Sequence, residues 1–566
     1  MFETLFQRTR RATTGIAAIL ALATMTGCAV DDESFSPLDV QVRALSGTCG
    51  GQAGANPFST ISSYTLVVRD EAGKQLYSKA ASASGPTLTA LEVPAGSGLE
   101  LTLIGNAGGK PAWMARRSGQ KIVKNTTSTF DMTLMQVEAF TCLSPSAGSA
   151  PNVLFPSVTS IGKGRVLITG GFGVSNTAGG KTELSGAQDG AWIFDVDSGE
   201  LREAKAQARM AVPRAGHSAI FLPKSNRVLI VGGAQKMSVD AASGPPVWKV
   251  SDGVNYPYEI FDVETETFIK PEAVDFAVKR VFPNLMALSD DFVVALGGAV
   301  WPASANLDQT SYMNSSLYDP TVGTHGAFVD VKSQLPLNAV RAGAAIAPLG
   351  STPDGGTKVL VWGGDDDNVR AEVFVESTAP GDGLFDASYT VSGDITALAG
   401  GLYFPSLTPI GTAKAKDDPS TTVVQFLSVG GIRYANKAWQ APNKDDVYIV
   451  SVNEKTRKID TERVGGLDAG IYMHQANRTD AGHVVVSGGF SAWGQPASFT
   501  LRTFDIAKRA FENPPASATF VKRGGHGALA LTNDCVLMFG GVTAFDDLSK
   551  TSAAASDIYC PAHLLP

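Results

Sequence analysis

Seven short apolar runs along the chain each end in a pair of glycines. They read RVLITGG (165–171), RVLIVGG (227–233), FVVALGG (292–298), KVLVWGG (358–364), QFLSVGG (425–431), HVVVSGG (483–489) and CVLMFGG (535–541). Continuous apolar runs of this length, bounded by turn residues, are typical of buried strands. Their near-constant spacing predicts a repeat architecture, in which one supersecondary unit is copied around the fold.

Further strands flank each run. Upstream, the phrases LFPS, AGHS, VFPN, AGAA, YFPS, YMHQ and GGHG open another apolar segment that ends in a turn. Downstream, a third segment often carries an aromatic residue followed by aspartate, as in WIFDVDSGE, YEIFDVETET, SSLYDPTVG and LRTFDIAKRA. Aspartate suits the turn that follows because its side chain can accept hydrogen bonds from the backbone ahead. With a more polar fourth segment, each unit is predicted to be a four-stranded sheet.

These units resemble kelch repeats over roughly residues 150–562. The matching features are the Gly-Gly pair after the second strand, the aromatic–Asp third strand, and the Arg-x-Gly-His phrases at Arg214–His217 and Arg523–His526. The family's tryptophan before the fourth strand is mostly absent, so the repeats are divergent. The resemblance implies an all-β fold, a seven-bladed kelch-like β-propeller spanning residues 136–566. Glycine near the axis of such a ring would permit close approach and a positive φ, so we expect the Gly-Gly pairs to be structural.

Closure of the ring can also be predicted. The seventh unit ends at SDIYCPAHLLP, which is too short for a fourth strand and would leave an exposed edge. The apolar stretch QVEAFTCL (136–143) lies just before the first unit. We expect it to supply the missing strand.

Residues 36–135 lack the Gly-Gly phrase and form a different module. Alternating runs such as DVQVRAL, SYTLVVRD, GLELTLIG and STFDMTLM predict a small antiparallel β-sandwich. The stretch VPAGSGLELTLIG resembles immunoglobulin- or transthyretin-like modules of secreted bacterial proteins. A chain of 566 residues is too long for one core, so two domains are reasonable.

The first 27 residues are typical of a targeting segment. Three arginines precede the apolar run IAAILALATM, which is too short for a membrane span. The segment ends in Met25-Thr26-Gly27-Cys28 and resembles a bacterial lipoprotein signal, which implies lipidation of Cys28 and a tether over residues 28–35. Ala29 after the cysteine implies the outer membrane of the cell envelope more than the inner one. The alternative is an ordinary cleaved signal with a chance cysteine.

The remaining cysteines are Cys49, Cys142, Cys535 and Cys560, an even number for an oxidising compartment. Cys535 would begin the second strand of unit seven and Cys560 would end the third, within cross-link reach. We favour the pairs 535–560 and 49–142. A pairing of Cys142 with Cys560 stays open, because the closing strand would also border Cys560.

Candidate chemistry is sparse, and no catalytic residue, metal or cofactor is expected. Three histidines, His217, His474 and His526, would begin innermost strands and could surround a metal. In kelch-like repeats, however, histidine at this position is a structural hydrogen-bonding residue. The resemblance to copper oxidases of the galactose oxidase type would need a Tyr-His pair, whereas the chain has Tyr472-Met473-His474. The run from Asp365 to Asp367 suits either calcium or, more simply, a solvated turn.

Two sets of residues are candidates for ligand binding. Arginines at matching positions in four units could form a basic ring for an acidic ligand, or could anchor loops: Arg214, Arg280, Arg341 and Arg523. The long loops 172–190, 234–257, 299–314, 432–445, 490–500 and 542–555 would share one face with them. These loops carry aromatic residues suited to sugar stacking or protein contacts, unless they tuck under their own loops: Trp248, Tyr256, Trp301, Tyr312, Tyr434, Trp439 and Trp493.

Together these features predict an envelope-anchored, monomeric lipoprotein whose propeller binds a protein or glycan ligand on the long-loop face. A net charge of −8 gives it little electrostatic reason to bind nucleic acid. The alternative is a propeller enzyme acting on carbohydrate, of the oxidase or sialic-acid-type isomerase class.

Overall fold

The protein is described here from a computed structural model. The structure describes residues 35–45, 48–49, 52–53, 56–83, 85–146, 151–178, 181–205, 208–240, 247–253, 257–270, 280–300, 315–329, 337, 341–364, 371–397, 400–435, 438–479, 482–492, 495–496, 501–512, 522–542, 556–562 and 565. These residues are almost entirely β, which confirms the predicted fold class, and short 3-10 helices occur at Pro57–Ser59, Ser289–Asp291 and Asp394–Ala397. The chain divides into two compact units. One is built from residues 35–44 and 56–134, and the other from residues 45–55 and 135–564.

The first unit is one seven-stranded sheet. Its strands are β1 (Phe35–Ala44), β4 (Ser63–Arg69), β5 (Gln75–Ser82), β6 (Thr87–Pro94), β7 (Gly96–Ala107), β8 (Lys110–Ile122) and β9 (Ser128–Gln136), in the order β5-β4-β7-β8-β9-β1-β6. The two end strands β5 and β6 contact each other, so the sheet curls around a core that includes Leu38, Tyr64 and Trp113. Where two antiparallel sheets were predicted, hydrogen bonding is continuous, and β1 pairs in parallel with β9. Strand β1 lies between β9 and β6, and its alternating buried face packs in this core.

The second unit consists of seven four-stranded blades. In chain order their strands are β11 (Ser157–Ser160), β12 (Arg165–Thr169), β15 (Ala191–Asp195) and β16 (Glu200–Glu203) in blade 1; β17 (Ala215–Leu222), β18 (Arg227–Asp240), β20 (Tyr258–Asp262) and β21 (Thr267–Ile269) in blade 2; β23 (Asn284–Ala287), β24 (Val293–Leu296), β26 (Ser316–Asp319) and β27 (Ala327–Val329) in blade 3; β28 (Ala345–Ser351), β29 (Thr357–Trp362), β30 (Ala371–Glu376) and β31 (Gly383–Asp386) in blade 4; β34 (Ser406–Lys414), β35 (Thr422–Val429), β38 (Val447–Asn453) and β39 (Lys458–Arg463) in blade 5; β40 (Gln475–Thr479), β41 (His483–Ser487), β44 (Leu501–Asp505) and β45 (Ala510–Glu512) in blade 6; and β46 (Gly527–Ala530), β47 (Val536–Phe539), β48 (Ser556–Tyr559) and β10 (Phe140–Leu143) in blade 7.

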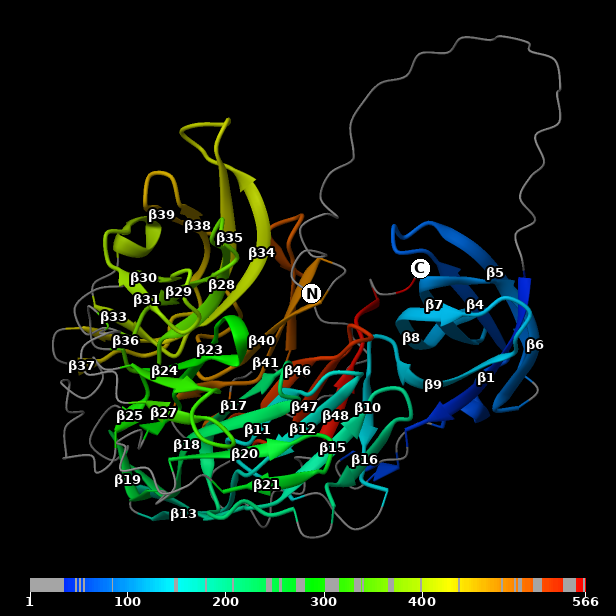
Figure 1. The fold of residues 1–566 in the computed structure, drawn as a ribbon, viewed down its shortest axis with the longest axis horizontal. Coiled ribbons are helices and arrows are strands. Elements are labelled where there is room, and N and C mark those ends of the chain that lie inside the picture. Colours follow the sequence, from blue (N-terminus) through cyan, green and yellow to red (C-terminus); the bar gives the residue numbers. More distant parts are fainter. Residues whose placement is uncertain are drawn as a thin grey trace. The chain divides into compact units, whose positions relative to one another are not determined.

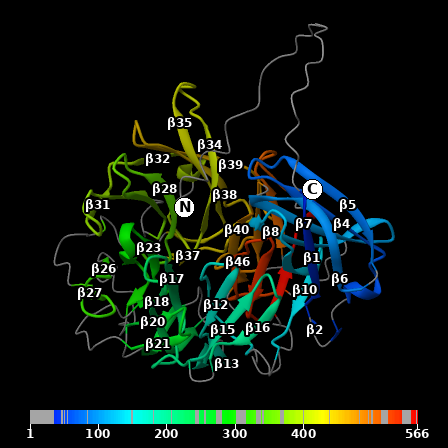
Figure 2. The ribbon, with the colours of Figure 1, turned by 45° about the vertical axis from the view of Figure 1, so that its right-hand side comes forward.

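The blades form a closed ring. The first strand of each blade contacts the first strand of the next, in the series β11, β17, β23, β28, β34, β40, β46, and β46 returns to β11. The cyan strands of blade 1 therefore lie beside the red strands of blade 7 (Figure 1). The second view shows the blades following one another in chain order, from β12 through β18 and β35 to β46 (Figure 2). This arrangement is a seven-bladed β-propeller.

Blade 7 closes the ring with strands from both ends of the propeller segment. Strand β10 pairs antiparallel with β48, with Phe140 opposite Tyr559. The prediction that residues 136–143 supply the missing strand is thus confirmed for Phe140–Leu143. The ring is thereby closed by hydrogen bonds between the two ends of the propeller segment, because β10 covers the edge that β48 would otherwise expose.

The Gly-Gly pairs mark the closest approach between neighbouring blades. Gly232, the first glycine of blade 2, has φ 75°, and a Cβ built there would lie 2.1 Å from the carbonyl oxygen of Arg280 in blade 3. The same contact recurs between Gly297 and Arg341, at 2.5 Å. Any side chain at this position would push two blades apart, so the pairs are structural, as expected.

The predicted long loops are partly strands. In blade 1 the loop forms the hairpin β13 (Phe172–Ala178) and β14 (Lys181–Ala187), and β14 pairs with the extended β18 of blade 2, which also pairs with β19 (Val247–Gly253). Smaller additions are β22 (Arg280–Val281) with β25 (Ala299–Val300), β33 (Gly401–Tyr403) with β36 (Ile432–Ala435) and β37 (Ala438–Trp439), and β42 (Phe490–Ala492) with β43 (Gln495–Pro496). Strands β2 (Thr48–Cys49) and β3 (Gln52–Ala53) form a hairpin, and β32 (Thr390–Gly393) extends blade 5 in parallel with β39.

Candidate functional site

The long-loop face has an apolar floor on the propeller axis. One residue at or just before the start of each innermost strand contributes to it, and all seven have φ between 51° and 67°: Phe155, Gly216, Phe282, Gly343, Phe404, Met473 and Gly525. We call this set the axial floor. Its backbones bond from blade to blade, for example from the Phe155 N–H to the Gly525 carbonyl (2.7 Å) and from the Phe282 N–H to the Gly216 carbonyl (2.7 Å).

Large and small residues are interleaved in the axial floor. A Cβ on Gly343 would lie 2.7 Å from the ring of Phe404, and one on Gly525 would lie 3.0 Å from the ring of Phe155. The rings also meet one another, with centroids 5.1 Å apart for Phe155 and Phe282 and 6.4 Å apart for Phe282 and Phe404. Each phenylalanine thus fills the space that the preceding glycine leaves.

The four matched arginines are buried and do not form an accessible ring. Each donates Nη1 to the carbonyl of the first glycine of its own blade, at 2.8–3.2 Å, and three of them pair with a carboxylate on the third strand: Arg214 with Glu259, Arg341 with Glu372, and Arg523 with Asp557. Arg280 instead lies 3.5 Å from the hydroxyl of Ser316. All four guanidinium groups are buried, which fits the alternative expectation that these arginines anchor loops rather than present a basic ring to an acidic ligand.

The three histidines join neighbouring blades. The Nε2 atoms of His217, His474 and His526 lie 2.8, 2.8 and 3.0 Å from the hydroxyls of Thr169, Ser406 and Ser487, each on the preceding blade. Burial lowers the pKa of His217 and of His474 to about 3, and lowers the pKa of His526 well below its usual value. Neutral rings bonded to separate hydroxyls match the structural role expected for them.

Most of the candidate loop aromatics lie outside the described residues: Tyr256, Trp301, Tyr312 and Trp493, as do Asp365–Asp367. Trp248 and Trp439 lie on β19 and β37, but their side chains are not among those described. Tyr434 on β36 is half-buried and packs against the cluster that contains the axial floor. It therefore follows the alternative expectation, in which an aromatic side chain tucks under its own loop.

A cleft of about 200 Å³ opens at the same end of blade 1, and sequence reasoning missed it. Its lining includes Gln188, Asp189, Trp192, Glu203 and Arg209 from blade 1 and Phe539 from blade 7. Arg209 Nη2 lies 2.5 Å from Glu203 and its Nε lies 3.8 Å from Asp189. In the sequence, the one signal of this cleft is Trp192 in the phrase WIFD. An aromatic residue in such a strand is expected in the core, and its neighbour in the cleft, Phe539, comes from the far end of the chain.

The cysteines follow the favoured pairing where they are described. Cys535 and Cys560 form a disulfide across β47 and the end of β48, which removes the alternative of a 142–560 bond. Cys142 is itself disulfide-bonded, and β10, which carries it, contacts β2, which ends in Cys49. Cys28 and the targeting segment lie outside the described residues, and among the described residues no helix is long and apolar enough to cross a membrane.

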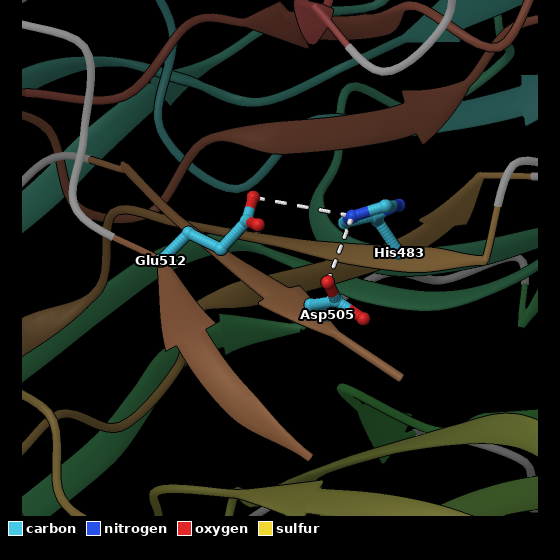
Figure 3. Close-up of side chains that lie close together, drawn as sticks. All are labelled: His483, Asp505 and Glu512. Carbon is cyan, nitrogen blue, oxygen red and sulfur yellow. Dashed lines mark ion pairs between the residues drawn. The ribbon is translucent and has the colours of Figure 1, made fainter. Parts of the chain in front are cut away.

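A second polar cluster lies at the opposite end of blade 6. His483 begins β41, Asp505 ends β44 and Glu512 ends β45, and their side chains point toward one another (Figure 3). His483 Nε2 lies 3.8 Å from Asp505 Oδ2 and 3.9 Å from Glu512 Oε2. The Nζ atom of Lys508 also lies 2.8 Å from Asp505 and 2.9 Å from Glu512.

Comparison with known proteins was made by sequence and by structure. No family model matches the sequence, and no curated protein matches it. One solved structure that this chain matches is described as a novel fungal alcohol oxidase with catalytic diversity among the AA5 family, in complex with copper. The match covers 73% of this chain and 76% of that one, with 14% identity and a TM-score of 0.46.

Proposed function

We propose that this chain is an envelope lipoprotein, anchored through Cys28, whose kelch-like propeller binds a ligand on the long-loop face. The observation that carries the proposal is the cleft between blades 1 and 7. It combines the 9%-exposed indole of Trp192 with amide, carboxylate and guanidinium groups, the mixture that fixes orientation in small-molecule sites.

The charge and size of the cleft favour a neutral glycan. Asp189 and Glu203 bring two carboxylates against the single guanidinium of Arg209, so an acidic ligand would be repelled. Carboxylates accept hydrogen bonds from sugar hydroxyls, and an indole offers a flat apolar face. The volume of about 200 Å³ is below the usual range for a whole drug-sized ligand, so the cleft suits one sugar unit of a longer chain.

Binding can be tested with the purified full-length chain on an array of neutral and acidic glycans. Both carboxylates are about 40% exposed or more, so the double change Asp189→Asn/Glu203→Gln should leave the fold intact and weaken binding of the best neutral glycan at least tenfold. Glu183→Gln, on β14 and 65% exposed, is the matched control and should bind normally.

Other outcomes would redirect the proposal. Unchanged binding by the double variant, together with loss on replacing Lys163, Lys224 and Lys414 at the opposite face, would contradict it. Loss only on replacing Trp301, Trp439 and Trp493 by alanine would move the site to the outer loops. Conversion of the bound glycan to a product would favour the second candidate, a propeller enzyme acting on carbohydrate.

A further inference from the structure

One pair of facing positions on the second and third strands carries different residues in different blades. Where the second strand begins opposite the end of the third, blade 1 has Arg165 opposite Asp195 and blade 2 has Arg227 opposite Asp262. Blade 7 has the Cys535–Cys560 disulfide at this place. In blade 2 this position holds an ion pair, with Arg227 Nε 3.8 Å from Asp262 Oδ2, and in blade 7 it holds a covalent bond between the second and third strands.

Blade 6 departs from this pattern in two residues at once. His483 stands opposite Asp505 where blades 1 and 2 have arginine. Glu512, on the fourth strand opposite Thr503, adds a second carboxylate, whereas the same strand position carries Arg202 in blade 1 and Ile269 in blade 2. The repeats thus serve as internal controls, and they show that an imidazole and an extra carboxylate occur together only here among these three blades.

The carboxylate of Asp505 is held so that one oxygen faces this cluster. Its Oδ1 accepts the backbone N–H groups of Ala507 (2.9 Å) and Lys508 (3.0 Å) in the turn. Its Oδ2 is the atom that approaches His483 and Lys508. The side chains of His483 and Asp505 are only 12% and 9% exposed, so strands fix two of the three groups.

We propose that His483, Asp505 and Glu512 bind a divalent transition-metal ion, with Zn²⁺ the best fit. One imidazole and two carboxylates are ligands that Zn²⁺ accepts, and three protein ligands would leave a fourth position open to water. Tetrahedral ligand atoms about 2.0–2.2 Å from zinc lie roughly 3.3–3.5 Å apart. The two separations between His483 and the carboxylates, 3.8 and 3.9 Å, would need to shorten by about half an ångström, and all three ligand atoms lie within 4.8 Å of one another.

Lys508 is the competitor for this site. Its ammonium group already bridges Asp505 and Glu512, which shows that the cluster holds one positive charge. The side chain is 67% exposed and can leave without disturbing the core. Zinc binding would therefore displace the ammonium group, and removal of that group should strengthen the binding.

The test is titration of the purified full-length chain with ZnCl₂ by calorimetry, together with zinc content after dialysis. The native chain should bind one Zn²⁺, and Lys508→Met should bind it at least tenfold more tightly. His483→Arg recreates the Arg–Asp pair of blades 1 and 2, so it should keep the native Tm and lose the binding. Glu512→Gln is the second variant, in case the arginine does not fit. Neither native affinity nor the effect of these variants depends on the glycan cleft, so failure here leaves the proposed function standing.

Three results would overturn the assignment. Zinc binding that survives both His483→Arg and Glu512→Gln places the ion elsewhere. Absence of binding to Lys508→Met at millimolar zinc shows that the groups cannot close on a metal. Equal affinity for Ca²⁺ shows that the imidazole nitrogen is not a ligand, since calcium prefers oxygen ligands.

Discussion

Arg341 and Glu372 form a buried pair whose energetics can be tested by a double-mutant cycle. The guanidinium group donates to Glu372 through Nε (3.1 Å) and Nη2 (2.7 Å), and to the Gly363 carbonyl through Nη1 (2.8 Å). Both side chains are at most 2% exposed. Replacing Arg341 by methionine would leave a carboxylate buried without its counter-charge, which typically costs about 3–5 kcal/mol.

The double variant Arg341→Met/Glu372→Leu removes both charges and should cost much less, about 0–2 kcal/mol. Glu372→Leu alone would leave the guanidinium group buried without its counter-charge at a similar cost, so the coupling energy from the two single variants and the double variant should exceed about 2 kcal/mol. For a folded unit as large as this propeller, 1 kcal/mol corresponds to a Tm change of roughly 1 °C. Scanning calorimetry should show a Tm drop of about 3–5 °C for the single variant and a smaller drop for the double variant.

Arg202 and Glu266 provide the matched control. This bidentate pair joins blades 1 and 2, but the arginine is 36% exposed. Solvent screening limits such a pair to about 1 kcal/mol or less, so Arg202→Met should change the Tm by about 1 °C at most. Equal losses for Arg341→Met and the double variant would refute the reasoning, because the cost would then arise from packing rather than from an uncompensated charge.

Two other properties follow from the fold. Burial lowers the pKa of His217 to about 3, so its neutral ring contributes fully to folding stability above pH 6.5, and this contribution falls by about 1.4 kcal/mol for each pH unit below that. His217→Gln should therefore reduce the Tm loss between pH 7 and pH 5. An unchanged loss would contradict this. Deletion of residues 136–143 removes β10 from blade 7 and should lower the Tm of the propeller by many degrees, whereas an unchanged melting curve would show that β10 is not needed for closure.

The ring could be predicted because its information is local and repeated. Each apolar run before a Gly-Gly pair predicts one strand by itself, and the seven regularly spaced copies predict seven blades. The disulfide between Cys535 and Cys560 followed for the same reason, since both residues lie in one unit. Blade closure by Phe140–Leu143 was predictable because an incomplete last unit must find a strand elsewhere.

The sites depend on contacts that no local pattern reports. The cleft brings Trp192 of blade 1 beside Phe539 of blade 7, which is near the other end of the chain. From the sequence, His483 could be assigned only to the start of a strand. Its proximity to Glu512 depends on how the strands pair, which no local pattern shows. The arginines were found by position, but their carboxylate partners on the third strand decide that they anchor the blades.

The axial floor has seven members, and this odd number limits how large and small residues can alternate around it. Large and small residues alternate from Phe155 through Gly216, Phe282 and Gly343 to Phe404, so each ring lies over a glycine. An odd-membered circle cannot alternate throughout, so at least one pair of neighbours must be alike, and here that pair is large. That mismatch falls between Phe404 and Met473, where the second residue is the unbranched side chain best able to adapt its shape. A ring that lost one blade would have six members and would carry either no mismatch, if the blade of Phe404 or Met473 were lost, or two mismatches, whereas loss of two neighbouring blades, one with a large and one with a small residue, would leave one mismatch.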